Sequence, residues 1–172
     1  KLKDADAKLE EIETLKKSIR QCTSCFLFFQ SENVSLCETC RNTATDPSSL
    51  LIIEKDADFE SIKRSKTYKG MYFILGGLVP IVTKETPSFV RTKELLRTIE
   101  DRASKNVLKE IIIALSLNPQ GEHTDMYIRE ILAPLAQKYS LVITSLGRGL
   151  STGTELEYSD SETIKNALRN RG

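Results

Sequence analysis

Four cysteines constrain this chain more than any other feature, because their spacing is that of a tetrahedral metal site. Cys22 and Cys25 form one C-x-x-C pair, Cys37 and Cys40 form a second, and the chain contains no other cysteine. A C-x-x-C turn places two thiolates along one edge of a tetrahedron, so two turns supply the four sulfur ligands of a structural Zn²⁺ site. Such a site leaves no open position for substrate or water. We therefore expect a zinc ion that stabilises a small knuckle and does no chemistry.

Disulfides or redox-active pairs are the alternative interpretation of these cysteines. A thioredoxin-like redox site needs one C-x-x-C pair at a strand-to-helix turn, whereas here two pairs lie in a short polar segment. Reduced thiols that are available to a metal are typical of the cytoplasm, and we expect a cytoplasmic protein.

Composition excludes several other classes of protein. The chain has 172 residues, of which 40% are apolar and 28% charged, as in an ordinary globular protein. The longest uncharged stretch, residues 70–82, is too short to span a bilayer. The net charge of +1 does not indicate a nucleic-acid binder, so any DNA contact must come from local patches or from assembly.

The chain divides into four zones. We expect an amphipathic helix over residues 1–20, a zinc knuckle over 21–42, an α/β domain over 48–146 and a separate C-terminal segment over 147–172. The first helix begins abruptly on its own apolar stripe. Truncation of a longer chain and a frayed terminal helix that lies on its own domain explain this equally well.

Strands and helices alternate within the third zone. Apolar runs predict strands at 50–53, 71–75, 110–115 and 141–144, and residues 42–49 are expected to form a linker. Helical patterns start at Asp56, span 88–102, and span 122–132 up to an interruption by Pro134. Alternation of this kind predicts a parallel sheet with helices on its faces. A capping box at Ser159 predicts a last helix through Leu168.

Ligands of open α/β sheets bind beyond the carboxyl ends of the strands, so the residues there are the candidates for chemistry. Glu54 follows the first strand and is either a general acid/base or Mg²⁺ ligand, or a solvated carboxylate. A magnesium site would need several carboxylates after the third strand, but residues 116–120 supply none and only Glu122 follows them. Asp56 fits helix capping better than catalysis.

Basic side chains gather in three places, and each gathering is typical of a solvated face. Aromatic residues that would stack on bases are not interleaved with them. Phe26, Phe28 and Phe29 in the knuckle either cap the metal cluster or present an apolar surface. The basic residues are Lys63, Arg64, Lys66 and Lys69; Arg91, Lys93, Arg97 and Arg102; and Arg169 and Arg171.

The order of motifs resembles the bacterial recombination mediator family RecR. The matching parts are an amphipathic helix, I-R-x-C-x-x-C-F from Ile19, a second C-x-x-C, a strand ending in Glu54, Y-x-x-L-G-G from Tyr72, N-P-x-G-E-x-T-x-x-Y-I from Asn118, and R-G-L-x-x-G-x-x-L-E-Y from Arg148. The resemblance covers nearly the whole chain. It implies a zinc knuckle followed by a Toprim domain and a C-terminal segment that exchanges with a neighbouring subunit.

The resemblance also implies a role without catalysis. Members of this family form tetrameric rings that can encircle DNA, associate with RecO and RecF, and help to load RecA onto single strands coated by SSB. Glu122 matches an acidic position implicated in partner contact, and Arg148 matches the arginine of the family's R-G-L turn. With Glu54, these residues are our candidates for contact with partners or DNA. A Toprim-type nuclease or primase that uses Glu54, Asp56 and Glu122 with Mg²⁺ is the alternative.

The chain departs from the family pattern in several ways. Gln120 stands where the family usually has Glu, the knuckle loop is about three residues longer than usual, and residues 151–152 replace a customary Pro-Val. The helix-hairpin-helix that precedes the long helix in the family is absent from this sequence. That module carries the main DNA contacts and one ring interface, so we expect weak DNA binding, with a dimer as one possible state.

Overall fold

The fold is taken from a computed structural model that describes residues 18–82 and 86–147, together with positions 12, 16, 161, 163 and 164. Arg148, residues 151–152 and most of the expected last helix lie outside the described residues. Positions 12, 16 and 18 are helical, as predicted. The helix prediction is wrong at Ile19 and Arg20, because these residues form a strand that pairs with Gln30 and Phe29.

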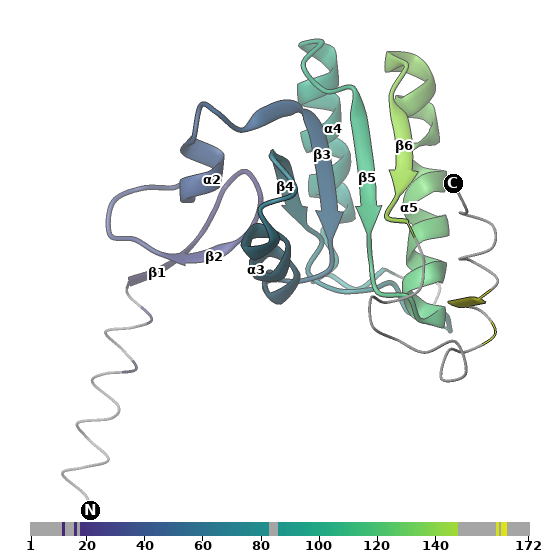
Figure 1. Ribbon diagram of the computed structural model, residues 1–172, viewed down its shortest axis with the longest axis horizontal. Coiled ribbons are helices and arrows are strands. Elements are labelled where there is room, and N and C mark those ends of the chain that lie inside the picture. The colour runs from purple at the N-terminus through teal and green to yellow at the C-terminus, as the bar shows by residue number, and fades with distance from the viewer. Residues whose placement is uncertain are drawn as a thin grey trace, which may run out of the picture.

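The knuckle is a β-hairpin followed by one short helix. Strands β1 (Ile19–Gln21) and β2 (Phe28–Gln30) pair antiparallel, and α2 (Glu38–Arg41) follows the longer loop. Figure 1 shows this unit beside the edge of the main sheet that β4 forms. One C-x-x-C pair lies in the hairpin turn and the other at the start of α2, so the loop between them closes the two pairs onto each other.

The main sheet has four parallel strands in the order β4-β3-β5-β6, which confirms the predicted α/β class. Its strands are β3 (Asp46–Ile53), β4 (Gly70–Ile74), β5 (Glu110–Ala114) and β6 (Val142–Ser145). The predicted linker is wrong at its end, because β3 already begins at Asp46. There the backbone pairs with Gly70, and the carbonyl of Ser48 accepts a hydrogen bond from the backbone N–H of Lys109. These bonds extend the strand beyond its apolar run.

In the described segments 18–82 and 86–147, the helices that cover the sheet are α3 (Asp56–Ser65), α4 (Thr92–Ser104) and α5 (Pro119–Tyr139). Helix α4 starts later than predicted, because residues 88–90 form a turn and the backbone N–H of Arg91 bonds to the carbonyl of Leu75. The predicted interruption at Pro134 is also wrong. Proline in a helix interior costs about 3 kcal/mol, but the same helix fully buries Ile128 and Leu132 before it, and this packing continues past the proline.

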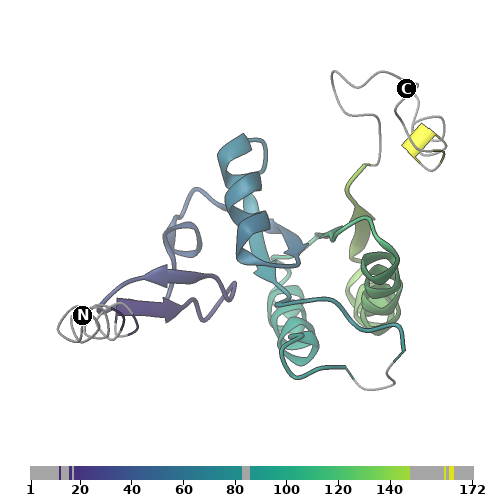
Figure 2. The ribbon, with the colours of Figure 1, turned by 90° about the horizontal axis from the view of Figure 1, so that it is seen from below.

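Alternate strand residues pack against different layers, because successive side chains of a strand point to opposite faces. Figure 2 shows α3 on one side of the sheet and α4 with α5 on the other. Leu50 and Ile52 of β3 pack with α4 and α5, whereas Leu51 and Ile53 pack with Phe59 of α3. Three of the four cysteines belong to this second cluster. The metal centre and the sheet therefore share one hydrophobic core.

The start of α5 requires glycine at position 121. A Cβ atom there would overlap the carbonyl oxygen of Ser116, and the backbone N–H of Gly121 donates to the side chain of Asn118, the N-cap residue. Gly121→Ala should therefore lower the free energy of unfolding by about 3 kcal/mol, as overpacked sites do. Urea unfolding measures this loss. Gly147→Ala is the matched control, because a Cβ at Gly147 meets no atom within 4 Å; equal midpoints for the two variants would contradict the close approach.

Candidate metal centre and the carboxyl edge of the sheet

The four cysteines converge on one point between the hairpin turn and α2. Their sulfur atoms all lie within 4.8 Å of one another, and those of Cys25 and Cys37 are 3.6 Å apart. None of the four is in a disulfide, and Cys22, Cys25 and Cys37 are almost wholly buried. In the part of the chain that the structure describes, no other three Cys, His, Asp or Glu side chains gather closely enough to hold a metal ion.

The donor set fits a divalent metal ion. The backbone N–H of Cys37 donates to the sulfur of Cys22 at 3.4 Å, as expected for a thiolate acceptor. The hydrogen bond from Cys25 lowers the pKa of Cys22, and the same bond raises the pKa of Cys25. A cation bound between the four sulfur atoms would hold all of them as thiolates. The four-cysteine metal site predicted from the sequence is confirmed as an arrangement of ligands.

The knuckle is joined to β4 at the second ligand. The backbone N–H of Ile74 donates to the carbonyl of Cys25 at 2.9 Å. The next residue, Phe26, has a left-handed backbone with φ of 67°, and its ring packs against that of Phe73 with centroids 5.2 Å apart. The guanidinium of Arg91 lies 5.3 Å from the centre of the Phe26 ring and donates to the carbonyl of Ile74. Metal ligand, aromatic ring and sheet edge are thus adjacent.

Helices α3 and α4 hold the knuckle from two further directions. Arg102 of α4 donates to the hydroxyl of Ser24 at 3.0 Å, and burial lowers the pKa of this arginine. Asp56 of α3 accepts a hydrogen bond from the backbone N–H of Phe28 at 2.9 Å. The carboxylate of Asp56 therefore has a structural partner in the knuckle. The sequence placed Asp56 at a helix start but carried no signal that it reaches the knuckle.

The three phenylalanines of the knuckle divide between two roles. Phe26 and Phe29 pack against the core that contains the cysteines, which agrees with capping of the metal cluster. Phe28 is 55% exposed and agrees with the other interpretation, an apolar contact surface.

Among the described residues, the acidic side chains at the carboxyl edge of the sheet do not gather into a group that could hold a metal ion. Glu54 follows β3, and its carboxylate accepts a hydrogen bond from the hydroxyl of Ser116, the second residue after β5. The side chain of Asn118 accepts from the backbone N–H of Gly121 at 2.8 Å and so caps α5. Ser116 and Asn118 thus stand where a magnesium site would need carboxylates, and their uncharged side chains make hydrogen bonds within the fold. Glu122 lies in the first turn of α5. It does not join Glu54 and Asp56 in a group that could hold a metal.

Apolar side chains are exposed on the loops that follow the strands. Val82 is 93% exposed and Leu117 is 68% exposed, and three others on these loops are more than half exposed. The others are Ile81, Phe89 and Leu146. Exposed apolar side chains gathered on neighbouring loops are typical of contact surfaces for macromolecules. No helix among the described residues is long and apolar enough to cross a membrane.

Comparison with known proteins matches both halves of the chain. The family model described as Toprim domain matches residues 48–146, and that described as RecR, C-terminal, matches residues 149–171. The chain is 33% identical over 160 residues to Recombination protein RecR of Paenarthrobacter aurescens. The matched region covers 93% of this chain and 75% of the relative. Recombination protein RecR of Bifidobacterium longum subsp. infantis is 35% identical over 162 residues, covering 94% of this chain and 76% of the relative. That of Dehalococcoides mccartyi is 32% identical over 162 residues, covering 94% and 74%.

Loss of one thiolate should disrupt the knuckle and weaken its attachment to the sheet. Cys37→Ser should abolish stoichiometric metal binding and lower the melting temperature, because a structural zinc ion contributes on the order of 10 kcal/mol of apparent folding free energy. Elemental analysis and thermal unfolding monitored by circular dichroism measure the two effects. Ser35→Ala, in the same loop, is the control. An unchanged melting curve for Cys37→Ser would show that the metal does not stabilise this fold.

Proposed function

The chain belongs to the RecR family of recombination proteins, and on that premise we propose that it is a non-enzymatic recombination mediator in DNA repair. It binds DNA as an oligomer and, with RecO-like and RecF-like partners, assists the loading of RecA onto SSB-coated single strands. The ion in the knuckle is Zn²⁺, and its role is structural. A reducing compartment keeps such thiols available to the ion, which supports a cytoplasmic location.

The carboxyl edge of the sheet carries this proposal. Phosphoryl-transfer sites that use Mg²⁺ need clustered carboxylates, and in the described residues the carboxylate of Glu54 has a serine hydroxyl as its partner. The edge also carries exposed apolar side chains, which are typical of contact surfaces. Both features favour a surface that holds other macromolecules over one that cleaves or copies a strand.

Three residues are our candidates for those contacts: Glu54, Glu122 and Arg148. Glu54 and Glu122 lie at the carboxyl edge of the sheet, after β3 and in the first turn of α5. Arg148 directly follows Gly147, where the continuous described segment 86–147 ends. We propose that the two carboxylates meet a basic partner protein, and that Arg148 meets an acidic partner or phosphate. A self-assembled dimer or tetramer would repeat these contacts around DNA.

A magnesium-dependent nuclease or primase is the second candidate, because the chain contains a Toprim domain with Glu54 directly after β3. It would use Glu54, Asp56 and Glu122 to hold the ion. The hydrogen bond from Phe28 to Asp56 speaks against this candidate, because it occupies one of the three carboxylates.

DNA binding should be electrostatic and should depend on assembly. Binding of a fluorescent single strand should weaken steadily between about 50 and 200 mM salt, because each phosphate contact releases a counterion. A purified RecO-like partner should tighten it. Fluorescence anisotropy across the salt series, with and without that partner, measures both effects. Failure to bind DNA at any salt concentration, alone or with the partner, would contradict the mediator role.

Catalysis should be absent under the same conditions. Incubation with labelled single and double strands and Mg²⁺ or Mn²⁺ should leave their length unchanged on a denaturing gel, with and without nucleotides. Glu54→Gln is the decisive control. Strand scission or primer synthesis that this substitution abolishes would establish the enzymatic candidate in place of the mediator.

A further inference from the structure

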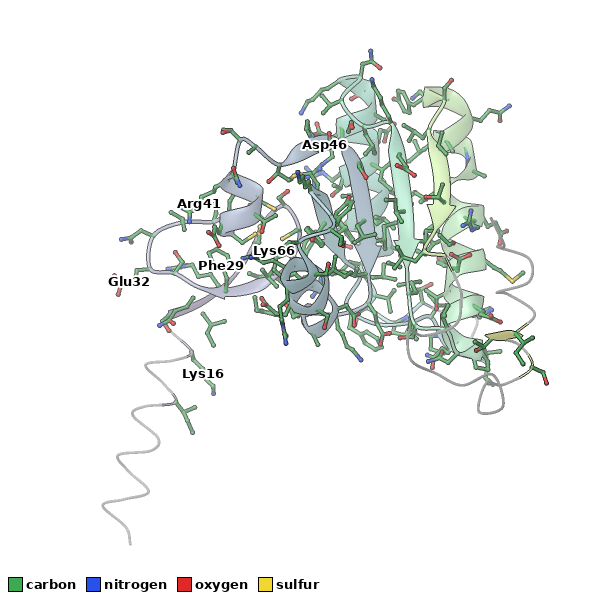
Figure 3. The ribbon with its side chains drawn as sticks, viewed as in Figure 1. Lys16, Phe29, Glu32, Arg41, Asp46 and Lys66 are labelled. Carbon is green, nitrogen blue, oxygen red and sulfur yellow. The ribbon has the colours of Figure 1, made fainter. Side chains whose placement is uncertain are left out.

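A groove runs along the seam between the knuckle and α3. It consists of two hollows of about 370 and 460 Å³. Glu38, Thr39 and Lys63 line both hollows, so the two are adjacent. In Figure 3, Phe29 and Arg41 mark the knuckle side of this seam and Lys66 marks the end of α3. The seam lies away from the carboxyl edge of the sheet described above.

The larger hollow combines basic side chains with a fixed aromatic ring. Lys63 and Lys69 are exposed at its rim, and Tyr68 lies between them in the chain and lines the same hollow. The Tyr68 hydroxyl donates to the carbonyl of Met71 at 3.0 Å and bonds to the hydroxyl of Ser49. The absence of aromatic residues among the basic runs, expected from the sequence, is therefore wrong here. Tyr68 belongs to the run from Lys63 to Lys69.

The ring of Tyr68 is held from behind. It contacts the buried ring of Tyr72 edge-on, with centroids 5.2 Å apart, and Tyr72 itself is only 3% exposed. Tyr68 remains partly exposed toward the groove. A rigid, partly exposed ring beside lysines is an arrangement with which proteins bind single-stranded nucleic acid, by stacking on a base and pairing with phosphates.

One ion pair crosses the groove. The Nζ atom of Lys63 lies 3.1 Å from a carboxylate oxygen of Glu38 on α2, with side chains that are 47% and 82% exposed. Exposed pairs of this kind are weak, so a phosphate can displace the carboxylate. Glu38 and Glu60 are the acidic residues that line the two hollows. Glu38 therefore competes directly with a phosphate for Lys63.

We propose that this groove binds one or more nucleotides of single-stranded DNA, with a base stacked on Tyr68 and the flanking phosphates paired with Lys69 and Lys63. The proposal rests on the DNA-binding role above and gives that role a location on the knuckle and α3. Thr39, Asn42 and Thr45 line the same hollow and supply uncharged hydrogen-bonding groups for the sugar and base. Because Lys63 is paired with Glu38, it can pair with a phosphate only after the phosphate has displaced the Glu38 carboxylate.

Charge variants with matched controls test the phosphate contacts. The probe is a fluorescein-labelled oligothymidylate of about twenty nucleotides, titrated with the whole chain at several salt concentrations. Lys69→Ala should weaken binding about three- to tenfold and reduce the salt slope by about one. Lys93→Ala, an exposed lysine on α4, should leave affinity within about twofold. Equal effects of the two variants would overturn the proposal.

Removal of the competing carboxylate gives a second test with the opposite sign. Glu38→Gln should tighten binding about two- to fivefold, because Lys63 loses its competitor. Glu100→Gln is the control, since Glu100 also forms an exposed ion pair, with Lys138 on the far side of the sheet, and loses the same charge. Equal tightening by both variants would overturn the proposal, because a general charge effect would then explain it.

Stacking on Tyr68 is tested by photochemical crosslinking. Oligonucleotides that carry 5-iododeoxyuridine should crosslink to the peptide containing Tyr68, as identified by mass spectrometry, and a duplex of equal length should crosslink less because its bases are paired. If the chain binds oligothymidylate but crosslinks elsewhere and with equal efficiency in duplex, the groove is wrong and the DNA-binding role stands. If it binds no DNA at all, both fall.

Discussion

The bond between the backbone N–H of Ile74 and the carbonyl of Cys25 joins the metal centre to the rest of the molecule. Cys25 is a candidate ligand, and Ile74 belongs to the edge strand β4, so one hydrogen bond connects the tetrahedron of sulfurs to the ladder of the sheet. The residues beside it strengthen the joint: Phe26 packs on Phe73, and Arg91 bridges the ring and the carbonyl of Ile74. A metal ion bound to the four cysteines would therefore stabilise the edge of the sheet as well as the knuckle.

The carboxyl edge of the sheet and the seam between the knuckle and α3 have different roles. At the carboxyl ends, a serine hydroxyl bonds to Glu54 and an asparagine side chain caps α5. The hydrogen-bonding capacity of this edge thus serves the fold, and its exposed apolar loops are available for contact. The seam between the knuckle and α3 is instead lined by lysines, a tyrosine and uncharged polar groups. We infer that apolar and acidic contacts with proteins, and basic contacts with nucleic acid, occupy separate surfaces of one small molecule.

Much of the fold could be predicted from the sequence, because apolar runs and cysteine spacing are local signals. The four ligands, the parallel sheet and the existence of each main helix follow from such patterns. The ends of a strand or helix could not be predicted where they depend on residues far away in the sequence. Asp46 joins β3 because Gly70 pairs with it, and α5 passes Pro134 because its apolar side chains pack on the sheet. The bonds of Asp56 to the knuckle and of Ser116 to Glu54 likewise join residues far apart in the chain.

The position of the knuckle also affects how readily another strand could pair with each edge strand of the sheet. An open strand edge is a template for pairing with another chain, and natural proteins usually cover it. Here the carbonyl of Cys25 accepts a hydrogen bond from the backbone N–H of Ile74 in β4, so the knuckle covers part of this border. Within the described part of the chain, β6 forms the other border. There the guanidinium of Arg129 donates to the carbonyl of Ile143, and it also donates to the side chains of Asp125 and Ser145. Pairing of a further strand with β4 at Ile74 would therefore require the bond to Cys25 to break, and pairing with β6 at Ile143 would require the bond to Arg129 to break.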